Sequence, residues 1–151
     1  MKMLHAGIWL AYLVSITAIL AAPNSFSAGI WADAIGIILL VGGGWLMMWA
    51  KNWMGRHYHR IPKIKPSHSL VTTGPYALTR HPEYLGIISG FLGLSLVLKS
   101  ITGLAACVLV IIPLHAYLAL KEEHLLGSHF KEKHEEYKKK VGVVPKLVKK
   151  R

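Results

Sequence analysis

Four stretches of the chain are almost wholly apolar, and turn-forming or charged residues separate them. They cover residues 4–22, 28–50, 84–98 and 101–120. A helix needs about 20 apolar residues to cross a hydrocarbon core of roughly 30 Å, and the third stretch, with about 22 Å at ~1.5 Å per residue, is short of that. The pattern predicts an all-α polytopic membrane protein with four transmembrane helices, in which the third and fourth form a hairpin turning at Lys99-Ser100. We treat residues 1–151 as one domain.

Positive charge is concentrated in two of the segments between and after these stretches. Six Lys and Arg residues lie in the connection 51–83 and ten in the tail 121–151, whereas 23–27 holds none and the third connection only Lys99. Cytoplasmic segments carry the excess of Lys and Arg. We therefore expect both termini and the loop 51–83 to be cytoplasmic, in a bacterial or archaeal cell membrane. A secretory signal peptide is not favoured, because no A-x-A-like cleavage site follows the first stretch.

Composition narrows the class of protein further. Of the 151 residues, 53% are hydrophobic and 17% charged, with a net charge of +11, whereas an ordinary globular domain is about 25% charged. Disorder of the whole chain is excluded by this hydrophobicity. The single cysteine, Cys107, allows no intrachain disulfide and no CxxC metal site. The lysine runs of the tail predict contact with anionic lipid headgroups, as does the basic loop; no aromatic platform accompanies them, so we expect no nucleic acid partner.

Small and aromatic residues indicate how the helices pack. Gly42-Gly43-Gly44 and the pair Gly86-x-x-x-Gly90 predict close approach of helix backbones. Trp45, Trp49 and Trp53 recur every four residues and so share one helical face, which is typical of an aromatic stripe at the membrane interface. In the fourth stretch, Pro113 predicts a kink.

The tail has helical periodicity. Apolar and other residues recur on one face at steps of four, four, seven and four, namely Glu122, Leu126, Phe130, Tyr137 and Val141. This spacing predicts that the fourth span continues as a cytoplasmic C-terminal helix to about Lys140.

The candidate chemistry lies in the segment 72–86 and at the root of the tail. Pro75 and Pro82 can each open a helix, one over residues 75–80 and one into the third span. Arg80 and His81 lie between these two starts, where a carboxylate or phosphate would find free N–H groups, a guanidinium fork and a switchable donor. Snorkelling of both side chains to lipid headgroups is an equally good reading.

Two acids stand apart from their basic surroundings. Glu122 and Glu123 follow directly after the fourth apolar stretch, and they can act in a site or simply form a salt bridge, for example to Arg80. His115 lies seven residues before Glu122 on the same helical face. A lone histidine within a span is more often hydrogen-bonded packing than a site residue.

The segment from Gly74 resembles a known signature. The run Gly74-Pro75-Tyr76-x-x-x-Arg80-His81-Pro82-x-Tyr84-x-Gly86 is similar to the GPYxxxRHPxYxG motif of the isoprenylcysteine carboxyl methyltransferase family. His68-x-Leu70-Val71 resembles the approach to it, and Glu122-Glu123 with Leu126 and Phe130 resembles the family's paired-Glu motif. The resemblance covers roughly residues 55–147 and departs from the family at Lys131, His134 and Lys146.

The resemblance implies an integral-membrane methyltransferase that uses S-adenosylmethionine, without a Rossmann domain or a metal. By this carry-over the cofactor pocket is lined by Tyr76, Arg80, His81, Tyr84, Gly86, Glu122 and Glu123. Arg80 and His81 would hold the cofactor's carboxylate, a glutamate its ammonium, and Tyr84 would face the sulfonium through cation–π attraction. Arg80 and Glu123 are the residues expected to be catalytic.

The acceptor stays open at the level of sequence. The resemblance implies a small lipophilic or prenylcysteine-like substrate that enters from the bilayer. A phospholipid N-methyltransferase, a non-catalytic lipid-binding scaffold and an NADPH-dependent membrane reductase are the alternatives. A carboxylate acceptor needs no base at pH 7, whereas an ammonium must lose a proton, to Glu123 or His81.

Overall fold

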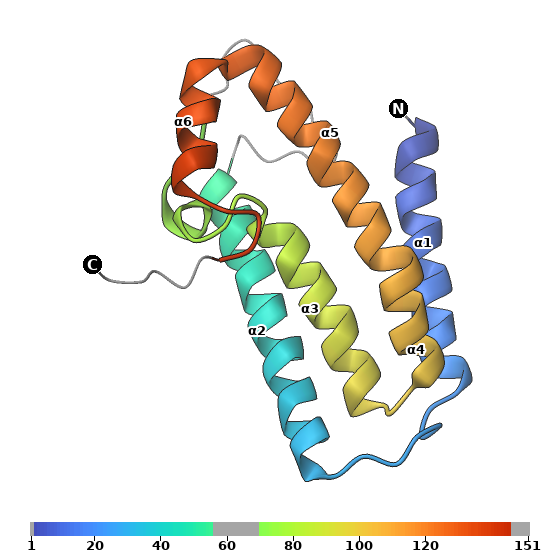
Figure 1. Cartoon of the computed structure of the whole chain (residues 1–151). Coiled ribbons are helices and arrows are strands. Elements are labelled where there is room, and N and C mark those ends of the chain that lie inside the picture. Colours follow the sequence, from blue (N-terminus) through green and yellow to red (C-terminus); the bar gives the residue numbers. More distant parts are fainter. Residues whose placement is uncertain (1, 56–69, 146–151) are drawn as a thin grey trace.

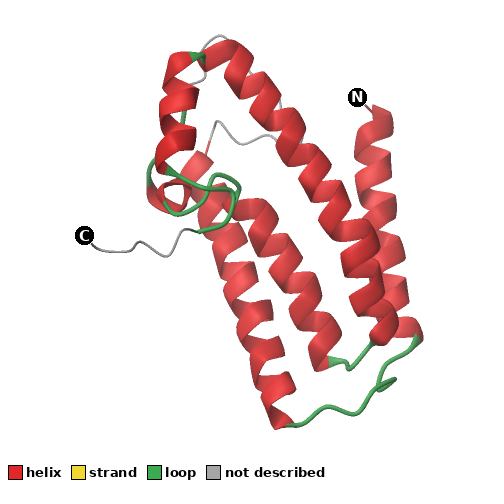
Figure 2. Cartoon of the chain, in the orientation of Figure 1, coloured by secondary structure: helices red, strands yellow, loops and turns green. Residues whose placement is uncertain are grey.

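The computed structural model describes residues 2–55 and 70–145, and within these ranges the chain forms helices and loops without a strand (Figure 2). Of the residues noted above, His68, Lys146 and the basic run 149–151 lie outside the described part. The main helices are α1 (Lys2–Ala21), α2 (Ile30–Met54), α3 (Pro82–Val97), α4 (Ile101–Ala106), α5 (Ile112–Phe130) and α6 (Glu132–Lys140). A short 3₁₀ helix covers Gly74–Ala77, and a π-helical turn, Cys107–Ile111, joins α4 to α5.

Among the residues that the structure describes, three helices are long and apolar enough to cross a membrane. They are Met3–Ala21, Ile30–Met54 and the continuous rod Ile101–Phe130, which comprises α4, the π turn and α5. The remaining apolar helix, α3, has 16 residues and is shorter than the usual span. The all-helical membrane architecture is therefore confirmed, with three candidate spans and one shorter apolar helix.

The long rod is irregular where the sequence predicts a kink. The N–H of Ile112 donates to the carbonyl of Cys107, five residues earlier, which is π rather than α geometry. Pro113 follows at once and has no N–H to continue the ladder. Such π turns are frequent at functional positions, and this one precedes His115 by one turn of helix.

Glycines bring α2 and α3 into backbone contact. A Cβ built on Gly43 would lie 2.6 Å from the carbonyl oxygen of Gly86, and one on Gly86 would lie 2.8 Å from the Met47 nitrogen. Any side chain at these two positions would separate the helices, so the close approach predicted for Gly43 and Gly86 is present. The backbone of Gly90, one turn along α3, belongs to the same contact, since its nitrogen would lie 2.9 Å from a Cβ built on Gly43, but a Cβ added to Gly90 itself would have nothing within 4 Å.

The turn predicted at Lys99-Ser100 is also present. Lys99 has a positive φ of 50°, and the Ser100 hydroxyl accepts the Gly103 N–H at 3.1 Å to cap α4. The Lys99 ammonium lies 3.3 Å from Asp33 of α2. After this turn the chain returns along α1, so that α1 packs on α4 and α2 packs on α3 (Figure 1).

The prediction of one continuous helix to Lys140 is wrong. α5 ends at Phe130, Lys131 has a positive φ of 45°, and α6 then runs back beside the loop that precedes α3 (Figure 1). The reversal buries His134 and Tyr137, which are 1% and 7% exposed. A straight extension of α5 would have left both side chains in water, so tertiary contacts override the helical periodicity.

The helix predicted over residues 75–80 is shorter than expected. The 3₁₀ turn ends at Ala77, and the Arg80 N–H donates to the Gly142 carbonyl at 3.0 Å instead of continuing a local ladder. The first residue of the 3₁₀ turn must be glycine, because Gly74 has a φ of 61° and a Cβ at this position would collide with the Trp53 indole.

Candidate active site

Four charged or titratable side chains, which we call the polar cluster, meet where the loop before α3 faces α5. Arg80 Nη1 donates to Glu123 Oε2 at 2.6 Å, and His81 Nε2 lies 3.0 Å from Glu123 Oε1. On its other side, His81 Nδ1 lies 3.3 Å from Glu122 Oε2. The two motifs that the sequence places some 40 residues apart therefore form one site, and the Arg80–Glu123 salt bridge considered above is present.

Local geometry explains how Arg80 and His81 are presented. Pro82 opens α3, and His81 at its N-cap has a non-helical backbone with φ −128° and ψ 62°. The segment after α6 fixes the preceding residues, since Arg80 N–H donates to Gly142 and the Thr79 hydroxyl donates to the Val143 carbonyl. Arg80 and His81, which are neighbours on the loop, thereby both direct their side chains toward α5.

Tyr76 lines the same small cavity as Arg80, His81 and Glu122. Its ring is buried, its hydroxyl lies 3.9 Å from the Met54 sulfur, and its carbonyl accepts the Tyr137 hydroxyl at 2.6 Å. The Tyr137 bond ties α6 to the signature loop. Together with the segment at Gly142, α6 forms a roof over the polar cluster, a role that the sequence did not predict for Tyr137.

Burial and charge act in opposite directions on the pKa of His81, which is 5% exposed. Burial lowers its pKa, but hydrogen bonds to Glu122 and Glu123 and the charges of both carboxylates outweigh this, so the pKa is raised above its usual value. His81 is therefore held toward its charged form. Burial lowers the pKa of His134, the next histidine toward the roof.

Two buried nitrogens near the cluster have no hydrogen-bond partner among the described residues. They are Arg80 Nε and His134 Nδ1. A buried donor without a partner costs roughly 1–3 kcal/mol, so the cluster retains hydrogen-bonding capacity for a ligand after its internal ion pairs are counted.

Tyr84 joins the cluster to a second region. Its ring is stacked on His81 with centroids 5.5 Å apart and planes 9° apart, and its edge meets His115 at 5.4 Å. On the polar side it lines a cavity of about 20 Å³ together with Arg80, His81 and Glu122.

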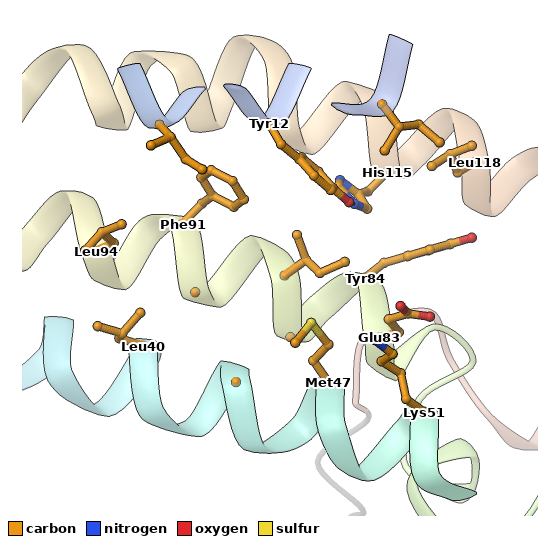
Figure 3. Close-up of a pocket in the computed structure, with 16 residues that line it drawn as sticks. Tyr12, Leu40, Met47, Lys51, Glu83, Tyr84, Phe91, Leu94, His115 and Leu118 are labelled. Carbon is orange, nitrogen blue, oxygen red and sulfur yellow. The ribbon is translucent and has the colours of Figure 1, made fainter. Parts of the chain in front are cut away.

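On the other side of Tyr84 lies a larger space, which we call the apolar cavity. It holds about 360 Å³ between α1, α2, α3 and α5, within the range of small-ligand sites, about 300–1,000 Å³. Figure 3 shows Tyr12, Phe91 and His115 directed into it, with Lys51 and Glu83 near Tyr84 at one end. No sequence motif indicated Tyr12 or Lys51, since they belong to helices far from both motifs.

The remaining predicted site residue, Gly86, contributes backbone only. It lines the apolar cavity and lies in the α2–α3 contact described above. His115 is hydrogen-bonded as expected, with Nδ1 2.8 Å from the Ile111 carbonyl and Nε2 3.0 Å from the Tyr12 hydroxyl. Within residues 2–55 and 70–145, no group of three or more His, Cys, Asp or Glu side chains could hold a metal ion.

An apolar helical bundle with a charged cluster beside an apolar cavity is the architecture of a membrane protein. A sequence model of the phospholipid methyltransferase family matches residues 31–133. The chain therefore belongs to this family of methyltransferases.

Curated relatives agree with the predicted resemblance. Protein-S-isoprenylcysteine O-methyltransferase of Saccharomyces cerevisiae is 32% identical over 72% of this chain and 46% of its own length. The nickel-cobalt-cadmium resistance protein NccN of Alcaligenes xylosoxydans xylosoxydans is 25% identical over 79% of this chain and 68% of its own length. The cobalt-zinc-cadmium resistance protein CzcN of Cupriavidus metallidurans is 26% identical over 93% of this chain and 63% of its own length. The chain thus spans about half to two thirds of the length of these relatives. The resemblance to isoprenylcysteine methyltransferases is confirmed.

Proposed function

We propose that this protein is an integral-membrane methyltransferase that transfers a methyl group from S-adenosylmethionine to a small lipophilic or prenylcysteine-like acceptor. The observation that carries the proposal is the continuity of the polar cluster with the apolar cavity through Tyr84. A zwitterionic, water-soluble reactant and a lipophilic one can thereby meet at one aromatic ring. Family membership supports the reaction class.

The residues of the cluster fit the cofactor's amino-acid end. Arg80 and His81 are donors for a carboxylate, Glu122 and Glu123 are acceptors for an ammonium, and the unpartnered Arg80 Nε offers a further donor. In the structure these groups pair with one another around a space of about 20 Å³, roughly that of a single water. Binding therefore exchanges internal ion pairs for pairs with the ligand and requires the roof to move outward.

The chain's own residues then position and shield the reaction. When bound, the cofactor supplies an electrophilic methyl group. Tyr84 presents an aromatic face at the boundary of the two regions, where attraction to a cation is worth about 0.5–2 kcal/mol. Apolar side chains such as Phe91 and Leu118 exclude water from the acceptor, and the fixed helices keep it aligned.

The proposal includes a four-span topology with the cluster and both termini in the cytoplasm. α3 would cross as the fourth apolar helix by local thinning of the bilayer, which tolerates short helices at modest cost. The lysines at the end of α6, Lys138–Lys140, and the basic loop 51–83 would contact anionic headgroups. Cysteines introduced at Asn24 and Glu136 should be labelled by a membrane-impermeant thiol reagent from opposite sides of sealed vesicles. Labelling from the same side would contradict this topology.

Cofactor binding by detergent-purified protein tests the central claim. Radiolabelled S-adenosylmethionine should bind the wild type, and Arg80→Ala or Glu123→Ala should abolish binding. Glu135→Ala is the matched control, because this glutamate pairs with Lys138 on the outer face of α6. Undiminished binding in both cluster variants would contradict the assignment of the site, and the absence of binding to the wild type would favour a lipid-binding scaffold.

A phospholipid N-methyltransferase is the second candidate, favoured by the description of the matching family. Mass analysis of products from an amine-headed phospholipid and from a prenylcysteine should separate the two. Methylation of the phospholipid headgroup alone would replace the first acceptor by the second.

A further inference from the structure

A buried histidine and a tyrosine form a hydrogen-bonded pair in the wall of the apolar cavity, which Lys51 and Glu83 also line. His115 of α5 is 1% exposed, and its ring is stacked on Tyr12 of α1 with centroids 5.8 Å apart and planes 8° apart. Both side chains point into the cavity in Figure 3. Ionisable residues at membrane depth are rare and are candidate functional residues, and its place in the cavity wall distinguishes His115 from a histidine in simple packing.

The hydrogen bonds fix which nitrogen of His115 carries the proton. Nδ1 lies 2.8 Å from the Ile111 carbonyl, which can only accept, so Nδ1 is the N–H. Neutral His115 therefore has its lone pair on Nε2, and the Tyr12 hydroxyl, 3.0 Å away, donates to it. The π turn that ends at Ile111 places this carbonyl directly before the histidine's own turn of helix.

The lone pair lies close to the polar cluster. The edge of Tyr84 meets His115 at 5.4 Å, and the opposite neighbour of Tyr84 is His81 at 5.5 Å. One aromatic ring thus separates Nε2 from the groups proposed to hold the methyl donor. Lys51 and Glu83 line the end of the cavity near Tyr84 (Figure 3). The rest of the wall is largely aliphatic and aromatic, with Leu40, Phe91 and Leu94 along it, which suits a hydrocarbon chain.

We propose that Nε2 of His115 accepts a hydrogen bond from the head of the methyl acceptor, and that this head is a neutral hydroxyl, thiol or amine on a lipid chain rather than a carboxylate. Tyr12 occupies the lone pair when the cavity is empty, and the acceptor replaces it. A carboxylate offers no proton to Nε2 and would leave the lone pair opposed to a negative charge. This inference rests on the proposed function and narrows its acceptor to a lipophilic molecule with a proton to donate, which excludes methylation of a prenylcysteine on its carboxylate.

The same contact accounts for the proton in the reaction. As the acceptor's heteroatom forms its bond to the methyl carbon, the heteroatom–hydrogen bond breaks and the proton passes to Nε2. The electron pair of the broken carbon–sulfur bond remains on sulfur, so no further reactant is needed. His115 is then a general base held in one tautomer by Ile111.

Matched amphiphiles test the inference by binding alone. Full-length protein in lipid nanodiscs with ¹⁵N-labelled histidine is titrated with dodecanol, dodecyl methyl ether and dodecanoate, and the His115 Nε2 resonance is assigned by its loss in His115→Gln. Dodecanol should bind and shift this resonance, whereas the ether, which lacks the donor, and the carboxylate should bind more weakly. Tyr12→Phe should strengthen dodecanol binding about threefold, because an interhelical hydrogen bond in a membrane contributes about 0.6 kcal/mol, and should leave ether binding unchanged.

Two results would overturn the inference. Equal binding of dodecanol and the ether by both wild type and Tyr12→Phe would mean that the Tyr12–His115 hydrogen bond only holds α1 against α5. Preferred binding of dodecanoate would mean that the acceptor's head is a carboxylate. S-adenosylmethionine binding is measured on the same samples. If it is intact, either result contradicts only this inference, whereas its absence from the wild type contradicts the proposed function and leaves the alcohol-to-ether ratio as an independent observation.

Discussion

The polar cluster and the apolar cavity share Tyr84 but satisfy their surfaces differently. In the cluster every charged group has a partner on the chain itself, and the enclosed space is about 20 Å³. In the cavity the helices leave about 360 Å³ between them. Buried charges need partners, so in the absence of a ligand the charged side chains of the cluster pair with one another. An apolar surface has no such requirement and can remain open to the hydrocarbon chains of lipids. A ligand must therefore compete for the cluster but only fill the cavity.

The largest expected effect comes from forcing α2 and α3 apart at their closest backbone contact, beside the apolar cavity. Gly86→Ala places a methyl group 2.6 Å from the Gly43 carbonyl and should destabilise the protein by about 3 kcal/mol. Denaturation in mixed micelles measures it. Gly90→Ala, one turn away with open space around it, is the control and should be neutral or slightly stabilising. Equal losses in both variants would show that the two glycines have the same surroundings.

Opening the cluster should cost less. Arg80 and Glu123 form an ion pair of 2.6 Å, and their side chains are only 14% and 19% exposed. Arg80→Ala and Glu123→Ala each leave the other charge without this partner, so each should destabilise the folded protein by about 2 kcal/mol. The double variant should lose less than the sum, because neither charge is then left alone. Additivity in this double-mutant cycle would mean that the pair is not coupled in solution.

The cavity can be filled without altering the cluster. Gly90→Leu adds a side chain toward the empty space and should weaken dodecanol binding about tenfold, equivalent to ~1.4 kcal/mol, through lost apolar contact. S-adenosylmethionine binding should stay within about twofold of wild type, since a factor of two is only ~0.4 kcal/mol. Loss of both would show that the two regions do not bind their ligands separately.

Loosening the roof affects only the cluster. Tyr137→Phe removes the 2.6 Å bond to the Tyr76 carbonyl and should cost about 1 kcal/mol. Cofactor association should become faster, because the roof opens more readily. Tyr117→Phe, at an exposed position of α5, is the matched control. Unchanged stability and unchanged association rates in Tyr137→Phe would contradict the role of the roof.

The smallest effect is a pH dependence confined to the cluster. Because the pKa of His81 is raised in the folded protein, its contribution to stability is complete below the unfolded value of about 6.5. It is lost as the pH rises through the folded value. Wild type should therefore lose stability over this window, and His81→Gln should show a flatter profile. An identical profile in the variant would assign the titration to another group.

The sequence predicted the cluster better than the cavity, for a physical reason. Arg80, His81 and the glutamates lie in two short motifs whose residue types already indicate a charged site. Tyr12 and His115 have no such signal, because their pairing depends on how α1 lies against α5. The break at Lys131 was missed for a similar reason. The helical periodicity of the tail is real, but burial of His134 and Tyr137 reverses the chain at a position where local propensity favours continuation.

The roof has a consequence for the order in which the protein matures during synthesis. Its bonds join Tyr76, Thr79 and Arg80 to residues 61 to 64 positions later in the chain. The helices that line the apolar cavity all precede those later residues in the chain. The cavity can therefore assemble from helices made before the roof, and lipid can be the first ligand that the protein meets.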